Sequence, residues 1–182
     1  MINELTRPGN LTLQGKNYFI IKLAIMSANI GITEKNTQAI AEILSKLLAD
    51  EFVIYVKTRN AHWNVEGPDF IDKHKFFESQ YEQLDEIMDA VAERIRTIGH
   101  YSPATLQSFL ELTHLTERRN TLNSSKNFIK DLLEDHETTA VYLRENIGKV
   151  ADQLGDVGTS DFLTGLLKDH EKMAWFLRSH LA

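Results

Sequence analysis

The feature that most constrains the fold of this chain is a pair of long segments without glycine or proline, residues 33–66 and 69–98. Glycine and proline most often end helices, so each segment predicts one long helix. The first should cover residues 34–64, about 45 Å at 1.5 Å per residue, with Thr33 as its N-cap. In the second, apolar residues follow an unbroken 4-3-4-3-4-3 spacing from Phe77 to Ile98. This spacing is typical of helices that pack in a bundle.

The rest of the chain predicts two more long helices and one short helix. Gly99 ends the second helix, and a short helix is expected over residues 103–112 in the connection that follows. Amphipathic spacing predicts a third long helix over residues 122–150 and a fourth that begins after Gly158. No segment alternates apolar and polar residues long enough to be a strand. Four long helices joined by turns predict an all-α protein with a four-helix bundle.

The first 32 residues differ from the rest. They carry Pro8 and Gly9 among polar residues and predict an extended N-terminal arm, residues 1–32, ahead of one bundle domain, residues 33–182. An apolar stretch in the arm resembles a secretory signal only superficially, because Lys22 interrupts it. Apolar runs of four or five residues are far shorter than the ~20 that a membrane-spanning helix needs. We therefore expect a cytoplasmic protein with no membrane association.

The composition limits the chemistry that the protein can carry out. The chain has no cysteine, which excludes disulfides, zinc ribbons, iron–sulfur clusters and thiol nucleophiles. Any metal must therefore be held by His, Asp and Glu. The formal net charge of the 182 residues is −6, and this sign argues against a surface built mainly to bind the phosphates of nucleic acid.

Candidate ligands lie along the second predicted helix. His74 and Glu78 are four residues apart, as are Asp89 and Glu93, so each pair shares a helical face. Imidazole with carboxylate suits iron, zinc or manganese better than calcium. At 100° per residue all four lie about 60° to 160° from Phe77, from the edge of the apolar stripe outwards. Glu78 and Asp89 are about 16 Å apart along the helix, so a shared ion would need a second, two-fold-related subunit to supply half of the ligands.

A longer pattern bears on whether these residues bind metal. Taken alone, such carboxylates are most often solvated, and His62 beside Trp63 is more often a structural histidine. The pattern comprises the run Asn60–Phe70, His74 twelve residues after His62, Glu78 four residues later, and the run Asp89–Arg94. It resembles the signature of the Dps family, the mini-ferritins first named as DNA-binding proteins from starved cells. The similarity extends in pattern to the C-terminus and leaves the arm outside.

The resemblance implies a ferritin-like four-helix bundle, with a short helix between the second and third, that assembles into a hollow homo-dodecamer. It implies a ferroxidase with a two-iron centre, Fe2+/Fe3+, shared between subunits. Fe(II) would be oxidised preferentially by hydrogen peroxide and stored as ferric mineral, which protects against oxidative stress. The metal ligands that the resemblance implies are His62, His74 and Glu78 of one subunit with Asp89 and Glu93 of its neighbour.

Two further assignments follow from the resemblance. Trp63 adjoins the centre and is given a catalytic role, in which it intercepts oxidising equivalents; packing at the interface is the alternative. Alignment on the C-terminal tryptophan places Asp152, Asp156 and Asp161 in a pore on a three-fold axis, where carboxylates would concentrate cations. Val157 stands where an acidic residue is often found, so three solvated aspartates near a turn are the alternative.

Other interpretations stay open. A nucleoid-associated protein that binds and protects DNA is disfavoured by the negative charge and by an arm with only three basic residues. A larger ferritin would hold two irons inside each bundle through paired Glu-x-x-His motifs, of which Glu111–His114 is one match. His136 and His170 could hold a metal inside the bundle, although buried histidines are more often hydrogen-bonded structural residues. A cage without turnover would not oxidise Fe(II).

Overall fold

The computed structural model describes residues 28–117 and 123–182 and confirms an all-helical protein. Its elements are α1 (Glu34–Asn64), α2 (Phe70–Thr97), α3 (Leu106–Leu112), α4 (Ser125–Gly148), the π-helical turn η1 (Lys149–Gln153) and α5 (Val157–Ser179). The described residues contain no strand, and none of their helices is long and apolar enough to cross a membrane. Most of the predicted arm, residues 1–27, and the expected start of the third helix near Leu122 lie outside the described residues.

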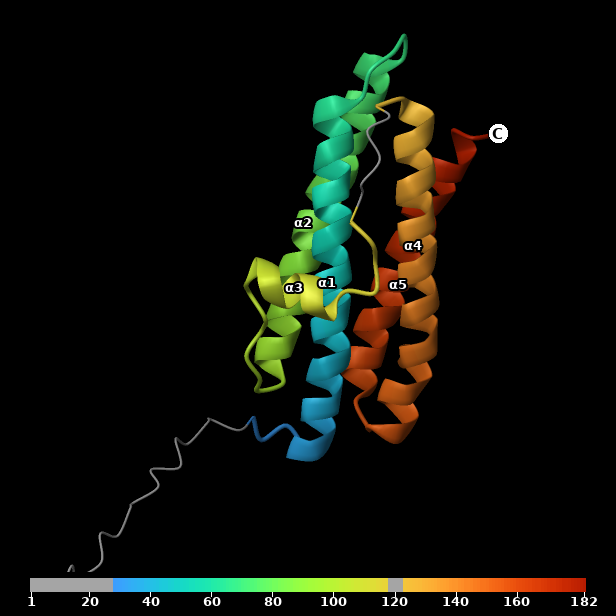
Figure 1. Ribbon diagram of the computed structural model, residues 1–182. Helices are drawn as coiled ribbons and strands as arrows, with labels where there is room; N and C mark the ends of the chain where they lie inside the picture. Colours follow the sequence, from blue (N-terminus) through green and yellow to red (C-terminus); the bar gives the residue numbers. More distant parts are fainter. Residues whose placement is uncertain (1–27, 118–122) are drawn as a thin grey trace, which may run out of the picture.

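The helices form two pairs, α1 with α2 and α4 with α5, which lie side by side, while α3 crosses the α1–α2 pair (Figure 1). Each long helix turns one apolar stripe inward, as the spacing predicted. The large side chains that are fully buried include Ile40, Leu44, Leu47, Ile54, Phe77, Leu84, Ile95, Phe128, Ile129, Leu132 and Leu143. Packing of these stripes leaves the remaining faces of α1 and α2 available for polar residues.

Local capping explains where the helices begin and end. Thr33 is the N-cap of α1, as expected, and its Oγ1 accepts a hydrogen bond from a backbone N–H three residues on at 3.3 Å. Thr105 caps α3 in the same way, which is why this helix starts later than residue 103. At the corner before α5, Gly155 has φ +74°, a conformation that suits glycine. The helix begins before Gly158, which lies in its first turn rather than ahead of it.

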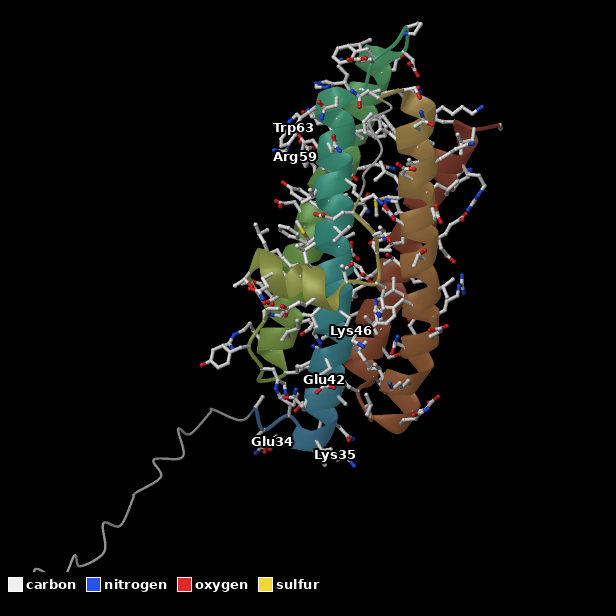
Figure 2. All side chains as sticks on the ribbon, in the orientation of Figure 1. Glu34, Lys35, Glu42, Lys46, Arg59 and Trp63 are labelled. Atoms are coloured by element: carbon white, nitrogen blue, oxygen red, sulfur yellow. The ribbon has the colours of Figure 1, made fainter. Side chains whose placement is uncertain are left out.

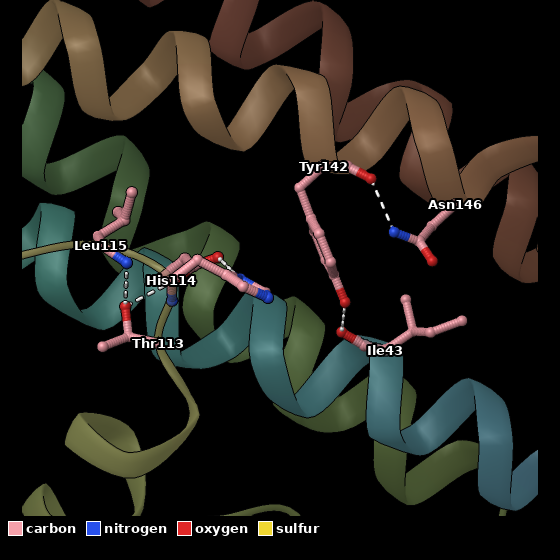
Figure 3. Close-up of polar contacts among 7 residues, drawn as sticks. Ile43, Thr113, His114, Leu115, Tyr142 and Asn146 are labelled. Atoms are coloured by element: carbon pink, nitrogen blue, oxygen red, sulfur yellow. Dashed lines mark hydrogen bonds and ion pairs between the residues drawn. The ribbon is translucent and has the colours of Figure 1, made fainter.

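The connection that contains α3 is fastened to the bundle by buried Asp50 of α1. Asp50 Oδ1 accepts hydrogen bonds from Thr113 Oγ1 and from the His114 backbone N–H, both at 2.7 Å, and Oδ2 lies 2.9 Å from His114 Nδ1. Close by, the Tyr142 hydroxyl donates to the Ile43 carbonyl and ties α4 to α1 (Figure 3). His114, the last residue of the single Glu-x-x-His match, therefore attaches this connection to α1.

A second polar group crosses the centre of the bundle. His170 of α5 stands between Glu51 of α1 and His136 of α4, with its Nε2 2.7 Å from Glu51 Oε1 and its Nδ1 2.9 Å from His136 Nδ1. All three residues are fully buried. Across residues 28–117 and 123–182, no three His, Asp or Glu side chains group closely enough to hold an ion. The arrangement supports the structural interpretation of these two histidines.

The buried histidine predicts a pH dependence of stability. Burial, together with nearby His170, lowers the pKa of His136 well below 6.5. The folded protein therefore keeps this imidazole neutral at a pH where the unfolded chain takes up a proton. His136 should therefore contribute a decrease in the free energy of unfolding as the pH falls below about 6.5, of up to about 1.4 kcal/mol per pH unit. Urea unfolding between about pH 7 and 5, at fixed protein concentration, measures this contribution as the difference in slope between the wild type and a variant without the histidine.

The control for this prediction is His136→Leu, which should show a shallower slope than the wild type. Burial raises the pKa of Asp135 to about 6, against the attraction of Lys57. Asp135 thus acts in the opposite sense, because the folded protein takes up its proton before the unfolded chain does. Both proteins keep Asp135, so its effect cancels in the difference between them. Equal slopes would contradict the prediction.

Candidate metal centre

Two histidines meet at the corner between α1 and α2. His62 lies in the last turn of α1, and His74 lies in the second turn of α2. The connection between them turns sharply at Gly67, whose φ of +132° is rarely adopted by residues with a side chain. The two imidazole rings stack with their centroids 3.7 Å apart and their planes at 22°. The turn thus brings His62 and His74, twelve residues apart in sequence, into direct contact.

Reciprocal hydrogen bonds fix the orientation of both rings. His62 Nδ1 lies 2.8 Å from the His74 carbonyl oxygen, and His74 Nδ1 lies 2.8 Å from the His62 carbonyl oxygen. A carbonyl oxygen can only accept, so each Nδ1 must carry the hydrogen. The neutral form of each ring therefore keeps its lone pair on Nε2, which is the tautomer that a metal ligand needs. Such bonds from the second ring nitrogen are how proteins orient metal-binding histidines.

A carboxylate shares the helical face of His74. Glu78 follows His74 by one helical turn on α2 and is half-buried. Its Oε1 accepts a hydrogen bond from the Tyr81 hydroxyl at 3.4 Å. The Tyr81 ring stands edge-on to His62, with 5.2 Å between centroids. Within one subunit, no three His, Asp or Glu side chains of the described residues group closely enough to hold an ion. The two imidazoles and this carboxylate would therefore supply only part of a coordination sphere for a divalent transition metal.

The remaining two expected ligands lie elsewhere in the subunit. Asp89 and Glu93 are exposed on the later turns of α2. Because α2 is one continuous helix, Asp89 stays about 16 Å from Glu78 along the axis. The structure therefore does not bring these carboxylates to the histidines within one chain. A site that used all five residues would have to be completed by a second subunit.

Aromatic and cationic side chains cover the corner on its outer side. Trp63 is 64% exposed, and the Arg59 guanidinium carbon lies 5.1 Å from its ring and 4.1 Å from the Tyr81 ring. Figure 2 shows Arg59 and Trp63 together near the C-terminal end of α1. Neither Arg59 nor Tyr81 was expected from the sequence to belong to the site. A usable signal was present, because each lies three residues from a candidate ligand, His62 or Glu78, and so shares its helical face.

The three aspartates expected in a pore differ in their surroundings. Asp152 and Asp161 are exposed, whereas Asp156 is 4% exposed and caps α5. Asp156 Oδ1 accepts from the Thr159 backbone N–H at 2.8 Å and lies 3.2 Å from Arg94 Nη2. The carboxylate of Asp156 thus connects α5 to α2. Asp152 and Asp161 present exposed carboxylates, as a cation-attracting ring between subunits would require, and the pore assignment of the three aspartates stays a prediction.

Comparison with known proteins agrees with the fold. The ferritin-like domain family matches residues 41–182. An uncharacterised low-temperature-induced protein of Nostoc sp. is 40% identical over 133 residues, which cover 73% of this chain and 74% of that protein. DNA protection during starvation protein 2 of Bacillus anthracis is 35% identical over 126 residues, covering 69% of this chain and 84% of that protein.

Solved structures extend the comparison to three dimensions. The Dps protein of Vibrio cholerae O1, described as a member of a broad superfamily of ferritin-like diiron-carboxylate proteins, aligns with a TM-score of 0.80 at 28% identity, over 86% of this chain and 97% of that chain. A Dps protein of Bacillus brevis aligns with a TM-score of 0.77 at 31% identity, over 83% of this chain and all of that chain. The fold and the family match thus define a ferritin-like protein. The chain belongs to the Dps family of iron-storage mini-ferritins.

The surroundings of the aspartates predict unequal effects of removing their charges. Asp156→Asn should lower the free energy of unfolding by about 2 kcal/mol, because the guanidinium of Arg94 loses its buried counter-charge. Asp161→Asn makes the same chemical change at an exposed position and should shift stability by less than about 0.5 kcal/mol. Thermal and urea unfolding of the two variants measure the difference. Equal destabilisation would contradict the assignment of Asp156 to the α2–α5 contact.

Proposed function

We propose that this protein oxidises Fe(II) at centres shared between subunits and stores the ferric product inside a hollow homo-oligomer. The observation that carries the proposal is the reciprocal bonding of His62 and His74, which sets both Nε2 atoms for metal binding beside Glu78. The distance of Asp89 and Glu93 from the corner supports a site completed by a second copy of the chain.

Each group has a role that its chemistry supports. His62 and His74 would bind incoming Fe(II), because imidazole is a good ligand for this ion. Glu78, with Asp89 and Glu93 of the second subunit, would favour the oxidised ion, since hard carboxylate oxygens stabilise Fe(III) over Fe(II). Two Fe(II) ions give up one electron each, and the pair of electrons with two protons converts one hydrogen peroxide into two waters. The proposal takes peroxide as the preferred oxidant.

Assembly would also cover apolar residues that one subunit leaves on its surface. Exposed residues of this kind are Val56, Leu106 and Leu110, which line a groove of about 330 Å³ between α1 and α3, and Val141, Trp175 and Phe176 on α4 and α5. Burial of such patches in a symmetric interface is the usual reason that a subunit retains them. We propose a dodecamer in which Trp63 faces the shared centre, where it would intercept oxidising equivalents or pack against the neighbour.

We propose that the protein is cytoplasmic and that direct DNA binding is at most a minor activity. The relatives named for DNA protection carry that function in their own names. In this chain the net charge of −6 per subunit would repel the DNA backbone at moderate salt.

The first test is stopped-flow oxidation of anaerobically added Fe(II) by hydrogen peroxide. The wild type should oxidise Fe(II) rapidly up to about two irons per centre, because the proposed shared centre binds two iron ions. His62→Ala with His74→Ala should remove this phase, while light scattering shows an intact assembly. Glu42→Gln, at an exposed position on α1, is the matched control and should behave as the wild type. Unchanged oxidation in the double histidine variant would overturn the proposal.

Mixed assemblies test whether the centre is shared. One chain carries His62→Ala with His74→Ala, and the other carries Asp89→Asn with Glu93→Gln; each should be inactive alone. When the two are unfolded and reassembled together in equal amounts, about a quarter of the centres should combine the intact halves, because pairing across the two-fold axis is random. Recovered activity near that fraction supports a shared centre. A centre built within one chain predicts no recovery.

The pore proposal predicts a defect in iron uptake without a defect in oxidation chemistry. Asp152→Asn with Asp161→Asn should slow Fe(II) oxidation several-fold at low iron concentration, because the ring of carboxylates no longer raises the local cation concentration. At high Fe(II) the rates should converge with the wild type. The same measurement on Glu42→Gln controls for the loss of a surface charge. Equal rates at every iron concentration would remove the pore role.

A further inference from the structure

We propose that Tyr81 is a positioning residue of the metal centre, which holds Glu78 and His62 in the geometry that binds Fe(II). This inference rests on the proposed function. The side chain of Tyr81 touches a candidate ligand from each of the two helices. Its hydroxyl donates to Glu78 Oε1 on α2, and its ring stands against the His62 ring on α1.

The hydroxyl is placed to steer one carboxylate oxygen. Glu78 and Tyr81 are three residues apart on α2, so their side chains rise from the same face of the helix. The bond at 3.4 Å is long for an O–H···O contact. A bond to an ionised carboxylate is nevertheless stronger than one between neutral groups. It engages Oε1 and leaves Oε2 of Glu78 as the oxygen to be turned toward an ion.

The ring of Tyr81 is itself held by its neighbours. The Arg59 guanidinium carbon lies 4.1 Å from the ring centroid, a distance at which the cation is attracted to the ring face. Tyr55 packs edge-on against the same ring at 6.3 Å between centroids. Tyr81 therefore has little freedom to rotate away from Glu78. A constrained donor costs less conformational entropy when it orients a ligand than a mobile one would.

The consequence for binding is that Tyr81 acts through Glu78. Partners of metal-ligating side chains commonly change metal affinity by ten- to a hundred-fold. Removal of the hydroxyl alone should therefore weaken binding at the centre while the packing against His62 and Arg59 persists. Because iron oxidises during a titration, anaerobic Co(II) serves as the probe, read by its visible absorption in the assembled protein.

The test compares Tyr81→Phe with Tyr55→Phe. Both variants delete one hydroxyl from the same aromatic cluster, but only the first removes the bond to Glu78. We expect Tyr81→Phe to bind Co(II) about ten-fold more weakly than the wild type and to alter its absorption bands, whereas Tyr55→Phe should match the wild type. A merely structural role would lower the melting temperature of Tyr81→Phe and leave Co(II) affinity unchanged, and that outcome would overturn the inference.

A double-mutant cycle tests the route through Glu78. In a Glu78→Gln background, Tyr81→Phe should cause little further loss of Co(II) affinity, because the bond that it removes no longer orients an ionised ligand. A full ten-fold loss in that background would contradict the mechanism. Co(II) binding by the wild type and by the His62→Ala, His74→Ala variant separates this question from the proposed function. If the two bind Co(II) equally well, the proposed metal centre is wrong, whatever the effect of Tyr81→Phe.

Discussion

The structure depends on the requirement that each long helix bury one apolar stripe. The stripe of α2, from Phe77 to Ile98, is continuous, and it packs inward along its whole length. This fixes the rotation of α2 about its own axis, because any other rotation would expose the stripe to water. Once that rotation is set, His74 and Glu78 must lie at the edge of the α1–α2 pair, and Asp89 and Glu93 must face outward.

Polar groups inside the bundle then select one arrangement among those that apolar packing allows. Asp50 accepts three hydrogen bonds from the connection after α3, and Asp156 joins the cap of α5 to Arg94. His170 fills the gap between Glu51 and His136. Each would be costly to bury alone. Together they favour one order and register of the helices, because a shifted helix would leave these groups without partners.

The same packing constraints separate the candidate metal ligands into two groups. The corner at Gly67 brings the two histidines into reciprocal contact, and Tyr81 links this contact to Glu78. The continuity of α2 keeps the remaining carboxylates distant. Under the proposed function, the chain would therefore present two incomplete halves of one ligand set on different parts of its surface. Two-fold symmetry is the simplest operation that joins such halves, and it links the proposed chemistry to assembly.

Much of this could be derived from the sequence, because helices are local and periodic. The absence of glycine and proline, the 4-3-4-3 spacing and the Thr33 cap were enough to predict α1 and α2, and angles at 100° per residue put the candidate ligands beside the apolar stripe. Family membership, too, was carried by the spacing from His62 to Glu93. The position of these residues along the chain was thus enough to predict the fold class, which the structure confirms, and to propose a ligand set shared with a second subunit.

Only the tertiary structure decided which side chains meet across helices. The sequence put Asp156 with Asp152 and Asp161, but packing of α5 on α2 buries Asp156 beside Arg94. Likewise, the two-sided contact of Tyr81 and the tautomers of both histidines depend on how α1 and α2 turn against each other. Contacts between residues far apart in sequence follow from the packing of whole helices, and periodicity within one helix does not specify them.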